Sequence, residues 1–264
     1  MRGKNTFGFN FVGIAPFALA LFFVFAFGLV SVPAQSAPGR GLTARFEPEY
    51  LKFAINHHFA ALRMTELAAG TDTTRNTQIR NNEGTAPTPG FPATQAKATL
   101  DEIKSLARRN NRAQREEILT AQRFLREWYG INYEPQISPV NQARIEILTE
   151  AHPGEQFNHL FLEIFSRHHF VIAARSLEAV VSRELEHQEL NRYARSILEV
   201  QMNDINDMRT LLCRNFNICD FQPYVGIKGR HAGDDGEIHN RYNRFNNVTR
   251  DEDEDGEDHL DGHP

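Results

Sequence analysis

Two pairs of adjacent histidines are the residues of this 264-residue chain whose type and spacing could do chemistry. One pair is His57 and His58, and the other is His168 and His169. On a helix, Met64 lies two turns after His57 on the same face, because the spacing follows the helical repeat. Imidazole nitrogen and thioether sulfur are ligands that favour copper over hard cations. The histidines therefore predict a metal-binding protein, with copper preferred.

A second group of potential ligands lies nearer the end of the chain. Gln201, Asp204 and Met208 recur at three- and four-residue steps, which places them on one face of a helix. If that face meets the helices that carry the histidines, nitrogen, oxygen and sulfur ligands gather in one interior. The alternative is that the histidines are hydrogen-bonded interior residues, and that Met64 and Met208 fill gaps in the core.

Four long amphipathic helices are expected to position these residues. Apolar residues recur at helical spacing over four stretches, and no stretch alternates as a strand would. The stretches are about 48–69, 94–128, 155–181 and 184–216. Residues 71–92 are rich in Thr, Asn, Gly and Pro, which predicts a long loop between the first two helices. We therefore predict an all-α fold in which two hairpins, 47–130 and 140–222, form one four-helix bundle.

The two predicted hairpins resemble each other in sequence. The first His-His pair matches the second, and Ile118–Gln122 matches Ile197–Gln201. Duplication of one hairpin explains both matches, and an insertion into the loop of the first copy explains why its motifs are farther apart in the sequence. We therefore expect two tandem copies of one helical hairpin.

These motifs resemble the domain-of-unknown-function 305 family. The residues from His57 to Met64, His-His-Phe-Ala-Ala-Leu-Arg-Met, are similar to the family pattern His-His-x-x-Ala-Ile-x-Met. Ile197 to Met208 is similar to the second pattern, Ile-Ile-x-Ala-Gln-x-x-Glu-Ile-x-x-Met. The resemblance covers about 47–128 and 155–216. It implies a ferritin-like bundle of a kind that is commonly exported and in some cases binds copper through His and Met.

Carried over position by position, the resemblance implies eight metal-binding positions. They are His57, His58, Met64, His168, His169, Gln201, Asp204 and Met208. Both halves depart from the pattern. Arg175 stands at the Met position of the second half, and Leu125 and Tyr129 stand at the acidic and Met positions of the first. We therefore expect one shared site, and a function in copper sequestration or tolerance by coordination, without catalysis.

Two other functions stay open. In the first, the histidines are structural and the chain is a non-catalytic interaction protein whose metal site has lapsed. In the second, the bundle is a dinuclear iron enzyme of the oxidase type, which uses two Glu-x-x-His motifs. The residues Glu184 to His187 form one such motif. Their place in the first turn of a helix predicts that both are in solvent.

The start of the chain predicts export. Residues 1–37 combine the basic Arg2 and Lys4 with an uncharged apolar run, 12–32, which is typical of a signal peptide. An uncleaved helix that anchors the protein in a membrane is the alternative. Cys213 and Cys219 predict a local disulfide, as in periplasmic or secreted proteins.

The end of the chain predicts a disordered acidic tail over 223–264. Eight of the 34 acidic residues lie in the last fourteen positions. Without this tail the basic and acidic residues nearly balance, so the body of the protein lacks the basic surface that nucleic acid binding requires. The expected partner is a metal ion.

Overall fold

The structure is a computed structural model that describes residues 43–80, 83–182 and 185–224. This part of the chain holds five helices and no strand, which confirms the prediction of an all-helical fold. The helices are α1 (Thr43–Ala69), α2 (Asp101–Tyr129), α3 (Pro139–Glu150), α4 (Glu155–Val181) and α5 (Gln188–Phe216). The predicted signal peptide or anchor, and the predicted tail beyond Tyr224, lie outside the described residues. No described helix is both long and apolar enough to cross a membrane.

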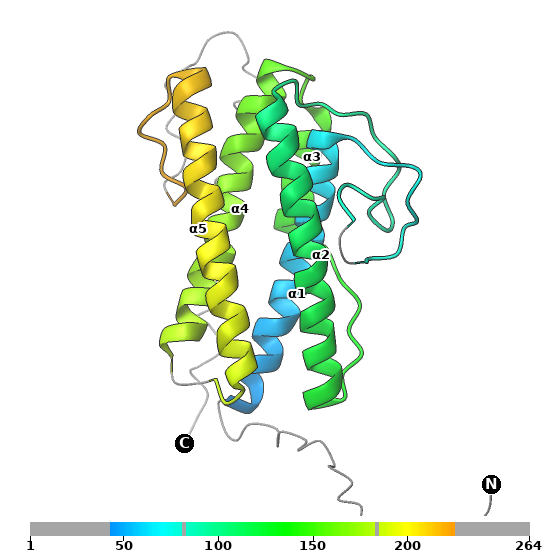
Figure 1. The fold of residues 1–264 in the computed structure, drawn as a ribbon, viewed down its shortest axis with the longest axis vertical. Coiled ribbons are helices and arrows are strands. Elements are labelled where there is room, and N and C mark those ends of the chain that lie inside the picture. The colour runs from blue at the N-terminus through cyan, green and yellow to red at the C-terminus, as the bar shows by residue number, and fades with distance from the viewer. Residues whose placement is uncertain (1–42, 81–82, 183–184, 225–264) are drawn as a thin grey trace, which may run out of the picture. The chain divides into compact units, whose positions relative to one another are not determined.

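The four long helices form two hairpins. α1 packs along α2, and α4 packs along α5 (Figure 1). The hairpins meet where α1 lies against α4, and the short α3 contacts both of these helices. Buried apolar side chains form two clusters, one around Met64, Phe161 and Met208 and the other around Leu51 and Ile197. The bundle therefore has two apolar regions that follow each other along its helices.

α2 begins later than its apolar pattern predicts, at Asp101 instead of about residue 94. The preceding residues run beside the end of α1, where the amides of Lys97 and Ala98 donate to the carbonyls of Leu67 and Ala68 at 3.0 and 3.2 Å. These bonds satisfy carbonyls that the end of a helix otherwise leaves without partners. Gly70 makes the exit possible because its φ of 82° lies in the left-handed region.

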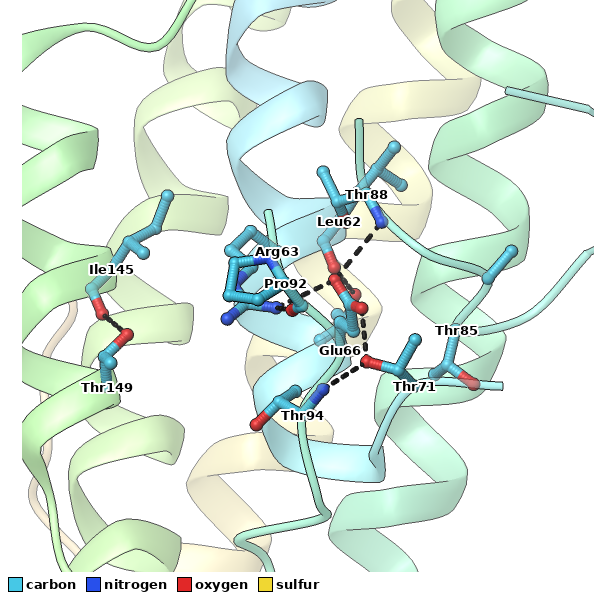
Figure 2. A network of polar contacts seen from close by, with 12 residues as sticks. Leu62, Arg63, Glu66, Thr71, Thr85, Thr88, Pro92, Thr94, Ile145 and Thr149 are labelled. Carbon is cyan, nitrogen blue, oxygen red and sulfur yellow. Dashed lines mark hydrogen bonds and ion pairs between the residues drawn. The ribbon is translucent and has the colours of Figure 1, made fainter. Parts of the chain in front are cut away.

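The long loop between α1 and α2 is anchored on α1 by the fully buried Glu66. Its carboxylate accepts hydrogen bonds from the amide of Thr88, at 3.3 Å, and from the hydroxyl of Thr71. Arg63 pairs with Glu66 at 3.1 Å and donates to the carbonyl of Pro92 at 2.9 Å. Figure 2 shows the Glu66 carboxylate at the centre of these contacts. The loop is therefore held at several points along its length.

α3 is not among the helices that the apolar repeats predict. Its start carries ordinary signals, because Ser138 caps the helix by accepting from the amide of Asn141 at 3.2 Å, and Pro139 occupies the first turn. Its apolar pattern is weak, because Asn141 and Arg144 are buried together with Val140, Ile145 and Leu148. A twelve-residue helix with buried polar residues does not show a clear apolar face.

Lys97 caps the end of α3. Its ammonium donates to the carbonyls of Leu148 and Ala151, at 3.3 and 2.9 Å, and to that of Thr149. Changing Lys97 to Met should lower the free energy of unfolding by about 2 kcal/mol, because three helix-end carbonyls lose a charged donor. Urea denaturation followed by circular dichroism measures the change. Lys104→Met is the matched control, since Lys104 pairs with the exposed Asp101. Equal losses in the two variants would contradict the prediction.

A disulfide joins Cys213, in the last turn of α5, to Cys219. Asn217 lies between them in the left-handed conformation, with φ of 56°, and its amide donates to the carbonyl of Cys213 at 3.1 Å. The disulfide thus fixes the chain directly after the helix end.

Candidate functional site

Each long helix carries buried polar residues at or next to the boundary between the two apolar clusters. We call them the polar layer. Its members are His57 and His58 on α1, Asn110, Asn111, Gln114 and Arg115 on α2, Ser166, Arg167, His168 and His169 on α4, and Gln201 and Asp204 on α5, with the partly buried Glu117 beside them. The structure therefore brings the four predicted histidines, Gln201 and Asp204 into the interior.

His57 and His168 form a stacked pair where α1 meets α4. Their ring centroids are 3.6 Å apart, with an angle of 21° between the planes. Nε2 of His57 donates to the backbone carbonyl of His168 at 2.8 Å, so its proton lies on Nε2. Burial, followed by the neighbouring charges, holds the pKa of both rings well below the usual value for histidine. Both rings are therefore neutral at pH 7.

The ring of His168 is buried without a hydrogen bond to the part of the chain that the structure describes. Among the described residues neither Nδ1 nor Nε2 has a partner, although the side chain is 1% exposed. Gln201 on the adjacent α5 is equally buried, and neither its amide oxygen nor its amide nitrogen has a partner in the described chain. Buried polar atoms in folded proteins are nearly always paired with protein, water or an ion. The unsatisfied atoms are therefore the strongest sign of a binding site in this interior.

His58 lies between two residues of α2. Its Nδ1 donates to the amide oxygen of Gln114 at 3.3 Å, and its Nε2 lies 3.2 Å from Oε2 of Glu117. Burial lowers the pKa of His58 to about 3 and raises the pKa of Glu117 to about 8. Although the distance is that of an ion pair, both groups are neutral at pH 7. The contact is therefore between a bare imidazole nitrogen and a carboxyl group.

His169 occupies the corresponding place in the second hairpin. Its Nε2 donates to the amide oxygen of Asn110 at 3.0 Å and lies 3.8 Å from Oδ2 of Asp204. Burial alone would raise the pKa of Asp204, but hydrogen bonds from His169 and Arg109 outweigh it, so the pKa is lowered. Arg109 holds this carboxylate from the edge of the bundle, at 2.9 Å. Asp204 is therefore ionised at neutral pH, unlike Glu117.

One hydrogen-bonded chain connects the two hairpins through this layer. The amide oxygen of Asn110 accepts from His169 at 3.0 Å and from the amide nitrogen of Gln114 at 3.2 Å. Gln114 in turn accepts from His58. The chain runs from α1 through α2 to α4, so the polar layer is continuous across the bundle.

The methionines do not belong to the polar layer. Met64 and Met208 are fully buried in the same apolar cluster, which also contains Phe161 and Phe165. Arg175, at the expected Met position of α4, is half-exposed and pairs with Glu178 at 3.0 Å. In the part of the chain that the structure describes, no three side chains of His, Cys, Asp or Glu form a group ready to hold a metal ion.

Gln114 and Glu117 are not among the residues that the sequence predicts for the site. Leu125, at the expected acidic position of the first half, belongs to an apolar cluster, and Tyr129, at the expected Met position, donates to Glu47. A signal for Gln114 and Glu117 is present in the sequence, because Gln-x-x-Glu-Ile over 114–118 repeats Gln-x-x-Asp-Ile over 201–205. This repeat pairs Gln114 with Gln201, whereas the match of 118–122 with 197–201 pairs Gln122 with Gln201.

His187 is not in solvent, contrary to the expectation for the Glu-x-x-His motif. It is buried, its ring stacks on Trp128 with centroids 3.9 Å apart, and its Nδ1 donates to Oε2 of Glu47 at 2.6 Å. Glu47 also accepts from the hydroxyl of Tyr129 and from the amides of Glu186 and His187, the latter two at 2.8 and 3.0 Å. This contact, which we call the Glu47 clasp, ties α1, α2 and the start of α5 together.

Part of the chain matches one known protein family. Residues 93–212 match the family model "Domain of unknown function (DUF305)". The DUF305 match supports the family resemblance, and it covers a little less than half of the chain. It includes both Gln-x-x-acid motifs and the second His-His pair, whereas His57, His58 and Met64 lie outside it. No curated protein and no solved structure matched the chain.

Proposed function

We propose that the chain is an exported DUF305 protein, built from two tandem copies of one hairpin, that binds a transition-metal ion in its polar layer. Copper is the preferred ion, and the role is sequestration or tolerance by coordination. The observation that carries the proposal is the buried His168, whose two ring nitrogens have no partner among the described residues. Neutral imidazole is the form that binds metal ions, and imidazole suits copper and zinc.

Two further observations support the proposal. His169 also has one ring nitrogen, Nδ1, without a partner in the described chain. Leaving such atoms unsatisfied costs about 1–3 kcal/mol each, so a bound ion would stabilise the layer. The Cys213–Cys219 disulfide is typical of proteins in oxidising compartments, which supports export.

A structural role for the histidines is the second candidate. His57, His58 and His169 each already make a hydrogen bond within the protein. In that case the polar layer only aligns the helices, and no metal is bound. The dinuclear iron enzyme has less support, because His187 of its single motif is engaged in the Glu47 clasp.

Copper titration distinguishes the first two candidates. The protein is prepared with His259 and His263 of its acidic tail changed to Ala, and binding of cuprous and cupric ions is measured by competition with a chelator. Removing a ligand of the interior site should weaken binding, so His168→Ala should lower the affinity by at least about ten-fold.

The matched control is His152→Ala, which removes an exposed histidine outside the polar layer. Its copper affinity should equal that of the parent protein. Equal affinities for the His168 and His152 variants would refute interior binding, as would a parent protein that binds no copper. Further variants, His57→Ala, His58→Ala and Met64→Ala, then show which of the other predicted ligands take part.

A further inference from the structure

We infer that a carboxylate, and not a thioether, completes this centre: His58 and Glu117 form a nitrogen–oxygen site for divalent cations, and the carboxylate of Asp204 lies in the same polar layer. The inference rests on the proposed function and specifies its ligands and the charge of its ion. Glu117 is the new member, since the family pattern read along the sequence places Leu125 there.

The first pair has a spacing that suits a shared cation, and the second pair is wider. Nε2 of His58 lies 3.2 Å from Oε2 of Glu117, and Nε2 of His169 lies 3.8 Å from Oδ2 of Asp204. Two ligand atoms bound to one ion at about 2.1 Å are themselves about 3–3.5 Å apart. Each pair joins the two helices of one hairpin, but Nε2 of His169 already donates to Asn110, so the first pair carries the site.

The first pair lacks any other use for its facing atoms. Apart from each other, neither Nε2 of His58 nor Oε2 of Glu117 has a partner among the described residues. His58 is fully buried, and its other ring nitrogen is held by Gln114. The hydrogen bond to Gln114 fixes the imidazole so that its lone pair points toward the carboxyl group. This orientation by a neighbouring side chain is a common feature of metal-binding histidines.

The two pairs are close enough to influence each other. The charge of Asp204 acts on Glu117, and the charge of His169 acts on His58. The hydrogen-bonded chain also links the two imidazoles through the side-chain amides of Gln114 and Asn110. The donors of the two hairpins therefore belong to one polar interior.

The thioethers have a different environment. Met64 and Met208 are both fully buried among apolar side chains. Cuprous ion prefers soft sulfur ligands, whereas imidazole with carboxylate suits divalent ions, among which Cu²⁺ binds most strongly. The donor set of the polar layer therefore favours Cu²⁺, followed by Zn²⁺, over Cu⁺.

The test compares Glu117→Gln and Asp204→Asn with Met64→Leu and Met208→Leu in the full chain with His259 and His263 changed to Ala. Affinities for Cu²⁺ and Zn²⁺ are measured by competition, and electron paramagnetic resonance reports the ligands of Cu²⁺. Glu117→Gln should lower the affinity for both ions by at least about ten-fold, and the resonance spectrum of bound Cu²⁺ should change. The two Leu variants should leave affinity and spectrum unaltered. Circular dichroism confirms that each variant is folded, and Glu117→Asp, which restores a carboxylate, should recover part of the affinity.

The results separate this inference from the function on which it rests. Loss of binding in His168→Ala or His58→Ala, with full binding in Glu117→Gln, would overturn the carboxylate site and keep interior metal binding. Greater loss in the Leu variants than in Glu117→Gln would overturn it in favour of thioethers. A parent protein without any metal affinity would overturn both.

Discussion

Changing Glu47 to Ala should lower the free energy of unfolding by about 3–5 kcal/mol, the largest effect we expect from a single substitution. The change leaves the hydroxyl of Tyr129, the ring of His187 and two backbone amides without their acceptor. All of these donors meet a side chain that is fully buried, so water cannot replace the carboxylate without opening the end of the bundle.

Trp128 provides the measurement for this variant. It is the single tryptophan of the chain and stacks on His187, so its fluorescence should report the clasp directly. Urea denaturation followed by fluorescence and by circular dichroism gives the free energy of unfolding. Glu102→Ala is the control, because it breaks an exposed ion pair with Arg214 and should cost at most about 1 kcal/mol. A loss of similar size in both variants would show that the clasp does not stabilise the bundle.

Acid should unfold the protein with a midpoint between about pH 4 and 5. The pKa values of His57, His58 and His168 are lowered in the folded protein, that of His58 to about 3. Below the unfolded value of 6.5 the unfolded chain therefore binds more protons than the folded one, and stability falls as the pH falls. Each such proton contributes about 1.4 kcal/mol per pH unit. Denaturation midpoints measured from pH 3 to pH 8 test this; a constant stability between pH 6.5 and 4.5 would contradict it.

Glu117 should produce the opposite slope on the alkaline side. Its pKa is raised from 4.5 to about 8 on folding, so the folded protein keeps a proton that the unfolded chain has lost. Stability should therefore decline by about 1.4 kcal/mol per pH unit as the pH rises from about 4.5 to 8, which opposes the histidine slope below pH 6.5 and acts without it above pH 6.5. Because the side chain of Glu117→Gln cannot ionise, this variant should abolish the decline above pH 6.5 and steepen the acid limb. An unchanged alkaline limb in this variant would assign the slope to another group.

The long helices could be predicted because each carries its own apolar repeat. The end of α4 and the start of the apolar face of α1 could each be predicted from the residues of that helix alone. α3 differs, because its burial depends on contacts with α1 and α4 and not on a repeat within its own twelve residues. Likewise, the position of His187 follows from Glu47, which lies 140 residues earlier in the sequence.

The candidate site was predictable by residue type but not by pairing. Adjacent histidines on two helices indicated buried imidazoles, and all four are buried. Which α2 residues face His58 depends on how far α1 and α2 are displaced along each other. A shift of about two helical turns exchanges Glu117 for Leu125, and both alignments fit an amphipathic helix. Only the packed structure distinguishes them, through the contacts of His58 with Gln114 and Glu117.

The position of the polar layer between two apolar clusters has a consequence for how the chain avoids misassembly. Leucine, isoleucine and phenylalanine pack acceptably in many alignments, so two similar hairpins could settle one turn out of place. Such a slip would set His58 and His169 against aliphatic side chains and break the bonds through Gln114 and Asn110. Every slipped arrangement thus buries several unpaired polar groups at once. The polar layer therefore favours one alignment of the two hairpins over others that bury a similar amount of apolar surface.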